Sequence, residues 1–290
     1  MGLPLFPPGE DPGPNFAALV RPAAPTGLPA PTGLAAPIGT ATAVDTSSSR
    51  SGSTVRGPAT AHGTTVVALR YADGVVMAGD RRATEGNLIA HRAMEKVFPA
   101  DRHSVVAIAG AAGPAVEMVK LFQTQLEHYE KVEGVALSLE GKANQLSQMV
   151  RGNLPMAMQG LVVVPLFAGY DVRLGRGRIF TYDLTGGHFE EADHAATGSG
   201  GRDARTTIKL GWRPDLPRDE AIELAVRALY EAADEDSATG GPDLVRGIFP
   251  MVAAVTAEGY EPVSDSEVAE RFASLVERRS IGRGTPGGAP

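Results

Sequence analysis

The chain changes its character abruptly at the bond between Gly63 and Thr64. Residues 1–63 hold 11 of the 22 prolines and only two aromatic residues, Phe6 and Phe16. A segment so poor in large apolar side chains cannot bury enough surface to offset the entropy that it would lose on ordering. We therefore expect residues 1–63 to be a disordered leader and the folded domain to begin at Thr64.

The threonine at this junction gains a chemistry of its own if the chain is cut before it. At a free N-terminus, a threonine carries a hydroxyl and an α-amine, whose reference pKa of about 7.7–8.0 lets it act as a base near neutral pH. An internal Thr64 lacks that base. Many ordinary strands also begin with a Gly-Thr pair, so the junction alone does not show whether the chain is cut before Thr64. A removable propeptide fits best, and a permanent tail is the alternative.

Composition excludes several classes of protein. The 227 residues after the leader suit one domain with a substantial core, and no apolar run reaches the roughly 18–20 residues that span a bilayer. The first residues lack the basic start of a secretory signal. The absence of cysteine fits a reducing, cytoplasmic compartment. With a net charge of −7 and a pI near 5.4, the chain lacks the basic surface of a nucleic-acid-binding protein.

Hydrophobic periodicity predicts clustered strands and paired helices. Strands are expected at residues 64–70, 75–78, 104–109, 161–167, 179–182 and 248–256. Helices are expected at residues 114–134, 138–158, 201–210 and 219–233, and from Ser264 onward. Pro155 should disturb the second of these helices, and Ser264 and Glu267 form a capping box for the last. This order favours an α+β fold in which helices pack outside stacked antiparallel sheets.

Common signals for metals and nucleotides are missing. The six histidines form no His-x-x-x-His or His-Glu-x-x-His pair, so the sequence predicts no metal site. Residues 110–113 precede a helix but match neither the Gly-x-Gly-x-x-Gly nor the phosphate-loop pattern. Residues 198–201 are interpreted as a loop, because they lack the pattern of a nucleophile elbow. We therefore expect no cofactor.

The spacing of Thr64, Asp80 and Lys96 resembles that of the N-terminal-nucleophile peptidases, specifically the β-subunits of actinobacterial proteasome cores. The resemblance covers nearly all of residues 64–280. The motifs that carry it are Thr-Thr-Val-Val-Ala-Leu at 64–69, Gly-Asp-Arg-Arg at 79–82, Lys-Val at 96–97, Ala-Gly-Ala-Ala-Gly at 109–113, Glu-His-Tyr-Glu-Lys at 127–131, Met-Val-Arg-Gly-Asn-Leu at 149–154, Gly-Ser-Gly at 198–200 and Asp-Ser-Ala-Thr-Gly-Gly-Pro-Asp-Leu-Val-Arg-Gly at 236–247. It implies the four-layer αββα sandwich of the N-terminal-nucleophile hydrolase fold over residues 64–280, followed by a flexible tail at 281–290.

The resemblance also implies catalytic roles. Thr64 would be the nucleophile of a threonine endopeptidase, with its α-amine as base after autocatalytic cleavage between Gly63 and Thr64. A lysine ammonium near Thr64 opposes a second positive charge and so favours the neutral amine, while Asp80 orients Lys96. Gly110 would present its backbone N–H to the oxyanion.

Three further residues would surround the terminal amine. Ser199, Asp236 and Thr239 match the family's positions there. The family often has serine where this chain has Thr239, which keeps a hydroxyl but leaves the role of that residue less certain.

A third group of residues would bind the substrate. Thr84 and Ala112 would hold its backbone as an added strand. Ile108, Ala112 and Val116 would line the pocket for the side chain before the cut, and their apolar character favours apolar residues there.

The implied assembly has two homo-heptameric β-rings capped by α-subunit rings. A regulatory ATPase ring and unfolded or pupylated proteins would be its external partners, with no nucleic acid and no membrane. One alternative is the bacterial two-component peptidase of a hexameric unfoldase, which shares the Thr-Thr start but usually has a very short leader and lacks the motif at 236–247. The other alternative is a non-catalytic structural ring subunit, although this chain retains Thr64, Asp80, Lys96 and Gly110.

Overall fold

The computed structural model of the chain describes residues 63–86 and 88–283. The strands are β1 (Thr65–Tyr71), β2 (Gly74–Gly79), β3 (Ala83–Glu85), β4 (Leu88–His91), β5 (Val97–Asp101), β6 (Ser104–Gly110), β7 (Val163–Asp171), β8 (Arg176–Tyr182), β9 (His188–Glu191), β10 (His194–Gly198), β11 (Met251–Thr256) and β12 (Gly259–Pro262). The helices are α2 (Ala112–Glu133), α3 (Leu139–Gly152), α4 (Leu154–Ala157), α5 (Gly201–Gly211), α6 (Arg218–Glu235) and α7 (Asp265–Arg283). The leader predicted at residues 1–63 lies outside this part of the chain except for Gly63.

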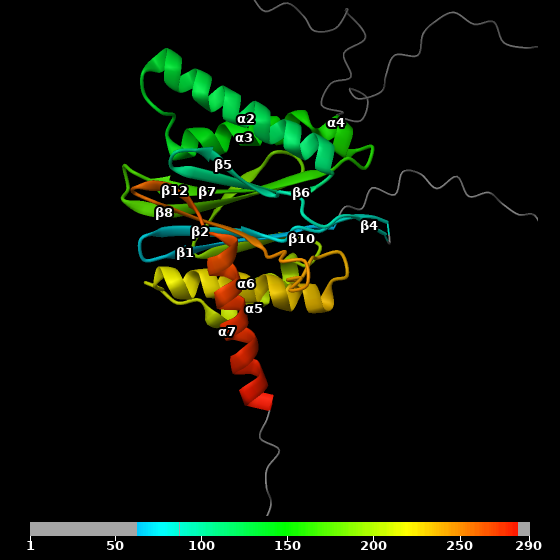
Figure 1. The fold of residues 1–290 in the computed structure, drawn as a ribbon. Helices are drawn as coiled ribbons and strands as arrows, with labels where there is room; N and C mark the ends of the chain where they lie inside the picture. Colours follow the sequence, from blue (N-terminus) through cyan, green and yellow to red (C-terminus); the bar gives the residue numbers. More distant parts are fainter. Residues whose placement is uncertain (1–62, 87, 284–290) are drawn as a thin grey trace, which may run out of the picture. The chain divides into compact units, whose positions relative to one another are not determined.

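The described domain is a sandwich of four layers. One five-stranded antiparallel sheet has the order β10-β1-β2-β11-β12, and the other has the order β5-β6-β7-β8-β9. Helices α2 and α3 cover the outer face of the second sheet, and helices α5 and α6 cover the outer face of the first (Figure 1). The predicted αββα order of layers is confirmed.

Strand β1 shows why the first apolar run of the sequence is continuous rather than alternating. Val66 and Ala68 point into the cluster between the two sheets, whereas Val67 and Leu69 point into the cluster under α5 and α6. All four side chains are fully buried. A strand inside a four-layer sandwich is covered on both faces, so its sequence is continuously apolar rather than alternating.

The disturbance predicted at Pro155 is confirmed, because the helix predicted at 138–158 is divided into α3 and α4 at Asn153, where Pro155 lacks the backbone N–H that a continuous helix needs. Two other predicted boundaries were wrong. Helix α2 begins at Ala112, two residues before its predicted start. The last long strand begins at Met251 rather than at residue 248.

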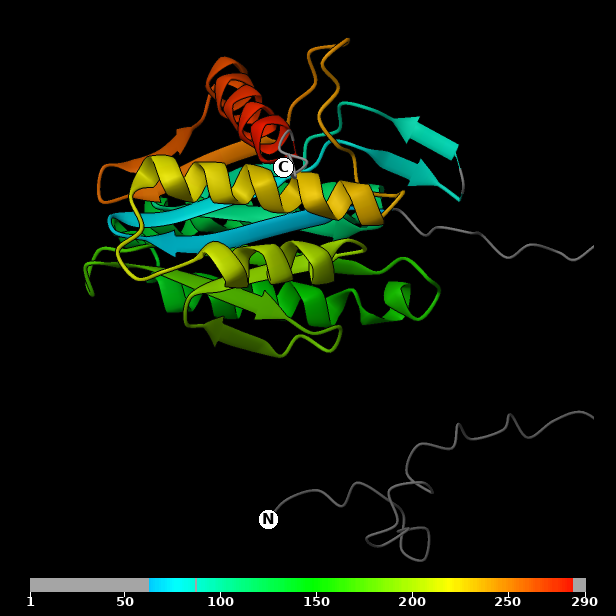
Figure 2. The ribbon, with the colours of Figure 1, turned by 90° about the horizontal axis from the view of Figure 1, so that it is seen from below.

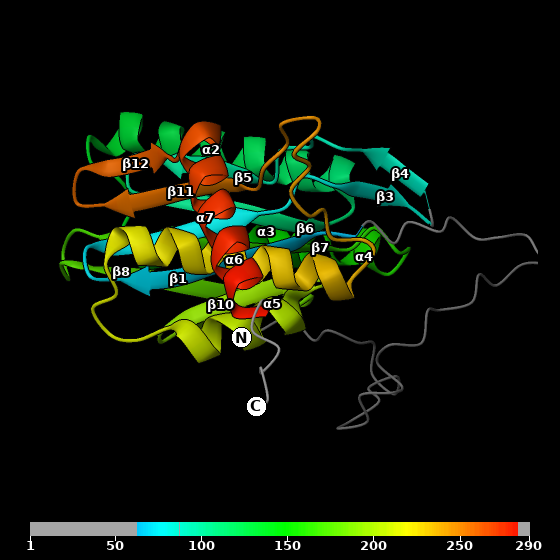
Figure 3. The same ribbon diagram turned by 60° about the horizontal axis from the view of Figure 1, so that its bottom comes forward.

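Six strands were not predicted: β3, β4, β5, β9, β10 and β12. They have three to five residues each. Strand β4 has the sequence Leu-Ile-Ala-His, and all four residues are exposed, so the strand has no buried face. Strands β3 and β4 form a separate hairpin that projects from one end of the sandwich beside the loop at residues 236–250 (Figures 2 and 3).

The last helix follows its predicted start. The backbone N–H of Glu267 donates to Ser264 Oγ at 3.2 Å, as the capping motif predicts. Helix α7 continues to Arg283, three residues into the segment predicted to be a flexible tail, and residues 284–290 lie outside the described part. None of the helices within residues 63–86 and 88–283 is long and apolar enough to cross a membrane.

Candidate active site

Thr64 lies immediately before β1 and is held through its backbone. The residue is 5% exposed, and its nitrogen is part of the peptide bond to Gly63. Strand β10 pairs with β1 so that Gly198 faces Thr65, and the N–H of Ser199 donates to the Thr64 carbonyl at 2.9 Å. Antiparallel pairing therefore fixes Thr64 at the end of a buried strand.

Asp80 follows β2 and lies beside this residue because β2 pairs with β1. Its carboxylate is fully buried and accepts four hydrogen bonds. Oδ1 accepts from the Thr65 N–H at 2.8 Å and from Lys96 Nζ at 2.7 Å. Oδ2 accepts from the N–H groups of Arg82 at 2.9 Å and Gly240 at 2.8 Å. One carboxylate thus joins the start of β1, the lysine and the loop after α6.

Lys96 precedes β5 and has almost no contact with solvent. Its side chain is 1% exposed, and Nζ donates to the Arg82 carbonyl as well as to Asp80. Burial lowers the pKa of Lys96 below its ordinary value, against the opposing effect of the Asp80 carboxylate. The ammonium therefore holds its proton less tightly than a free lysine does. The predicted Asp80 and Lys96 meet beside the residue that follows Thr64.

Ser199, Asp236 and Thr239 form a second cluster at the same end of β1. Asp236 Oδ2 accepts from Ser199 Oγ at 2.5 Å and from Thr239 Oγ1 at 2.6 Å. Partial burial raises the pKa of Asp236, but these hydroxyls and the N–H groups of Ala238 and Thr239 outweigh it, so the pKa lies below its ordinary value. Asp236 is therefore an acceptor at neutral pH.

Gly63 occupies a space that admits no side chain. Its N–H donates to Thr84 Oγ1 at 3.0 Å. A Cβ atom built on Gly63 would lie 1.9 Å from Ala238 Cβ and 2.9 Å from the Ala238 carbonyl oxygen. The residue before the predicted cut therefore fits only as glycine.

We expect Gly63→Ala to slow removal of residues 1–63 by roughly tenfold or more. Overpacking costs about 1–3 kcal/mol, and here it would displace the Gly63 carbonyl that Thr64 must attack. The fraction of chains that begin at Thr64, followed by intact mass during assembly, measures this rate.

Two variants control for this effect. Gly152→Ala adds a Cβ with no atom within 4 Å, so its processing should match the unmodified chain. Combining Gly63→Ala with Ala238→Gly removes the closest clash and should restore part of the rate. Unchanged processing of Gly63→Ala alone would show that the tight fit at this position does not control cleavage.

Gly110 ends β6 with a backbone that requires glycine. Its φ is +110°, and an added Cβ would lie 2.1 Å from the Val162 carbonyl oxygen. The N–H of Ile108 donates to the Lys96 carbonyl at 3.0 Å, and N–H groups two residues apart in a strand point to the same side. The Gly110 N–H therefore points to the same side of β6 as the Ile108 N–H, toward the segment that contains Lys96.

A surface pocket lies between the start of α2 and the segment before Lys96. It is lined by His91, Arg92, Ala93, Met94, Ala112, Gly113 and Val116. Two of the three residues predicted for the apolar substrate pocket, Ala112 and Val116, belong to it. The third, Ile108, is 3% exposed and belongs to the core cluster under α2 and α3, against which Val116 also packs.

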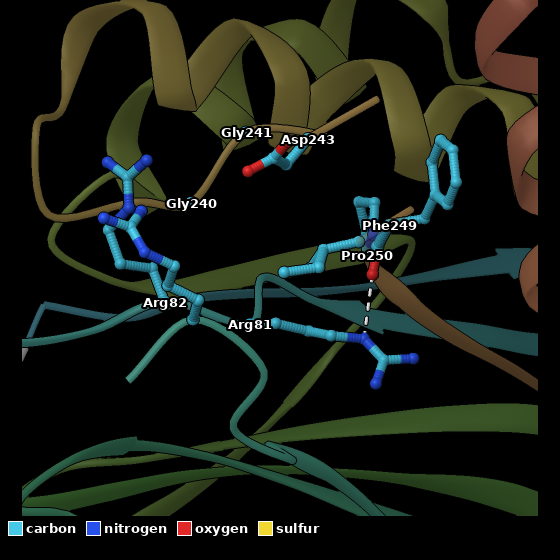
Figure 4. A pocket seen from close by; sticks show the side chains of 9 residues that line it. Arg81, Arg82, Gly240, Gly241, Asp243, Phe249 and Pro250 are labelled. Carbon is cyan, nitrogen blue, oxygen red and sulfur yellow. Dashed lines mark hydrogen bonds between the residues drawn. The ribbon is translucent and has the colours of Figure 1, made fainter. Parts of the chain in front are cut away.

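A second pocket shows how the loop after α6 is attached to the Asp80 segment (Figure 4). It is lined by Arg81, Arg82, Arg92, Gly240, Gly241, Asp243, Ile248, Phe249 and Pro250. Arg81 Nε donates to the Phe249 carbonyl at 2.8 Å, and Arg82 Nη1 donates to the Ser237 carbonyl at 2.9 Å. With the Gly240–Asp80 bond, these contacts hold the loop that carries Asp236 and Thr239.

Three contributors to the site were missed in the sequence. The Thr65 hydroxyl bonds Thr239, the Gly240 N–H donates to Asp80, and the Gly200 N–H donates to Thr65. The sequence places Thr65 at the start of a strand and in the motif at 64–69, and neither gives its side chain a role in the site. In the part of the chain that the structure describes, no three His, Cys, Asp or Glu side chains gather as metal ligands.

The chain is similar to known proteins over most of its length. Residues 60–245 match the family model described as "Proteasome subunit". The chain is 62% identical over 286 residues to a protein of Acidimicrobium ferrooxidans named "Proteasome subunit beta", covering 98% of this chain and 97% of that protein. It is also 62% identical over 218 residues to a protein of the same name from Streptomyces griseus, covering 75% of this chain and 78% of that one.

Proposed function

This chain belongs to the proteasome subunit family, and from that premise we propose that it is a catalytic β-subunit, a threonine endopeptidase made as a precursor. The observation that carries the proposal is the buried Asp80–Lys96 ion pair, which is hydrogen-bonded to the residue after Thr64. An ion pair this deeply buried is costly for stability alone, and such sites recur where chemistry requires them.

The first reaction of the site is on its own chain. Thr64 Oγ1 attacks the Gly63 carbonyl carbon, the Gly63–Thr64 C–N bond breaks as an ester to Oγ1 forms, and water hydrolyses that ester. Residues 1–63 leave with a new carboxylate on Gly63, and Thr64 gains a free α-amine. Thr84 supports this step by holding the Gly63 N–H.

The mature site then acts on other chains. The α-amine takes the Thr64 hydroxyl proton as Oγ1 attacks the substrate carbonyl, and the Lys96 ammonium favours the neutral amine and stabilises the developing alkoxide. The Gly110 N–H donates a hydrogen bond to the oxyanion that forms on the substrate carbonyl. The amine returns its proton to the leaving nitrogen, and water then releases the acyl group from Oγ1.

The remaining residues position the amine and the substrate. Ionised Asp236 accepts hydrogen bonds from the Ser199 and Thr239 hydroxyls, so each hydroxyl oxygen still has a lone pair that can accept from the terminal amine. Ala112 and Val116 line the pocket for the side chain before the cut, and Thr84 aligns the substrate backbone.

The proposal extends to assembly. The chain forms homo-heptameric β-rings with α-subunit rings in the cytoplasm, and it receives unfolded or pupylated proteins through a regulatory ATPase ring. The high identity to proteins named as proteasome β-subunits supports this assembly over the two-component peptidase. Sevenfold rather than sixfold symmetry in electron micrographs of the purified particle tests the distinction.

Covalent labelling tests the chemistry directly. We expect a peptide β-lactone, which acylates nucleophilic hydroxyls, to add one label per mature chain at Thr64 of the assembled particle, located by peptide mass mapping. Acetylating the α-amine beforehand should prevent labelling while the ring stays intact, because the base is lost. Absence of label at Thr64 in fully processed particles would favour a structural ring subunit and overturn the proposal.

A further inference from the structure

The second threonine of the domain lies at the centre of a closed hydrogen-bond network. Thr65 is fully buried, and its Oγ1 lies 2.6 Å from Thr239 Oγ1. Its Oγ1 also accepts from the Gly200 N–H at 2.9 Å. Thr239 is bonded to Asp236, Asp236 to Ser199, and Ser199 to the Thr64 carbonyl. The network therefore begins and ends on two consecutive residues of the chain.

The direction of each hydrogen bond follows from the groups involved. Asp236 only accepts when ionised, so the single proton of the Thr239 hydroxyl goes to Asp236. Thr239 must then accept from Thr65, whose own oxygen accepts from Gly200. The Gly200 N–H therefore donates to Thr65, the Thr65 hydroxyl donates to Thr239, and the Thr239 hydroxyl donates to Asp236. Each of the three hydrogen bonds has its own proton.

We propose that Thr65 is a positioning residue for the reaction of Thr64. Its hydroxyl fixes the place and the proton direction of Thr239, and through Thr239 it fixes Asp236 beside the α-amine. The inference rests on the proposed function and adds to it a residue that never touches the substrate. Thr65 lies in a strand whose next four residues are all apolar and fully buried, so its hydroxyl is not what the burial of β1 requires.

Valine at position 65 removes the hydroxyl while keeping the shape of the side chain. A methyl group needs about 3.5 Å from an oxygen where the hydroxyl now lies at 2.6 Å, so Thr239 must move by about 1 Å. The Gly200 N–H also loses its acceptor. Thr65→Ser retains the hydroxyl and therefore the direction of each hydrogen bond.

The test compares Thr65→Val, Thr65→Ser and Thr181→Val in full chains assembled with their α-subunits. Thr181 is a matched control on β8, where its hydroxyl donates to Glu191 at 3.2 Å in the other sheet. Turnover of a fluorogenic peptide is measured per mature chain, with the mature fraction taken from intact mass. We expect Thr65→Val to lower kcat about tenfold or more with KM within about twofold, and Thr65→Ser and Thr181→Val to stay near the unmodified values.

A second variant, Gly200→Ala, would displace the same two hydroxyls without changing either threonine. A Cβ on Gly200 would lie 2.7 Å from both Thr65 Oγ1 and Thr239 Oγ1, and the φ of Gly200 of −88° allows alanine. Gly200→Ala should therefore reproduce the loss of kcat, and it decides the question if Thr65→Val does not assemble.

The outcomes separate this inference from the proposed function. Equal kcat for Thr65→Val and Thr181→Val would overturn the inference, as would a rise in KM alone or a serine variant as slow as the valine variant. If Thr65→Val does not assemble, unchanged kcat in Gly200→Ala overturns it. Thr64→Ala is measured beside them, and full activity of that variant would overturn the proposed function itself.

Discussion

Thr64→Ala is expected to abolish peptide hydrolysis, by at least about 10⁴-fold, and to leave residues 1–63 attached in assembled particles. Alanine keeps the backbone bond to Ser199 but has no oxygen to attack either the Gly63 carbonyl or a substrate. Both losses therefore come from one missing atom. Fluorogenic peptide turnover and N-terminal sequencing of the same particles measure them together.

Thr64→Ser is the matched control, because it retains the hydroxyl and, after processing, the α-amine. It should keep measurable activity below that of threonine, since the lost methyl group frees the χ1 rotamer of the hydroxyl. An N-terminus at residue 64 in the alanine variant would mean that an outside protease removes the leader and would contradict autocatalysis.

Lys96→Ala is expected to lower kcat/KM about a thousandfold or more and to destabilise the fold by about 3–5 kcal/mol. The activity falls because the ammonium that favours the neutral amine and stabilises the alkoxide is gone. The stability falls because Asp80 stays buried with no compensating charge. Denaturant unfolding and peptide turnover measure the two effects separately.

The chain supplies a matched control for this variant. Lys142 is the other buried lysine among the described residues, and its Nζ lies 2.5 Å from Asp101, which ends β5, whereas Lys96 precedes the start of that strand. Lys142→Ala should cost about 3 kcal/mol in stability and leave kcat/KM per assembled particle unchanged. Equal losses of activity in the two variants would mean that Lys96 acts only through stability.

The layers of the fold could be predicted because they depend on long apolar patterns. The run that begins at Val66 and the apolar stripe of α2 are local in sequence and wide enough to signal burial. The short strands were missed for the opposite reason. Strand β10 exists because it pairs with β1, and the exposed β4 has no buried face, so only the tertiary structure specifies them.

The site was predicted in a different way, from a family resemblance rather than from periodicity. The resemblance identified Asp80, Lys96 and Thr239 as single positions, and the structure brings them to one end of β1. It could not give the connections between them. That the Thr65 hydroxyl bonds Thr239 depends on the return of a loop 174 residues later, which no local pattern encodes.

Strand β1 is covered on both faces and paired on both edges, by β2 and β10. Amides in such a central strand exchange with solvent only when most of the domain opens, because no smaller cooperative unit contains them. Thr64, the proposed nucleophile, is attached to the end of this strand. A nucleophile on a mobile loop can be displaced by local motion, whereas displacing Thr64 requires the free energy that opens the core. The geometry of Thr64 therefore persists for as long as the subunit remains folded.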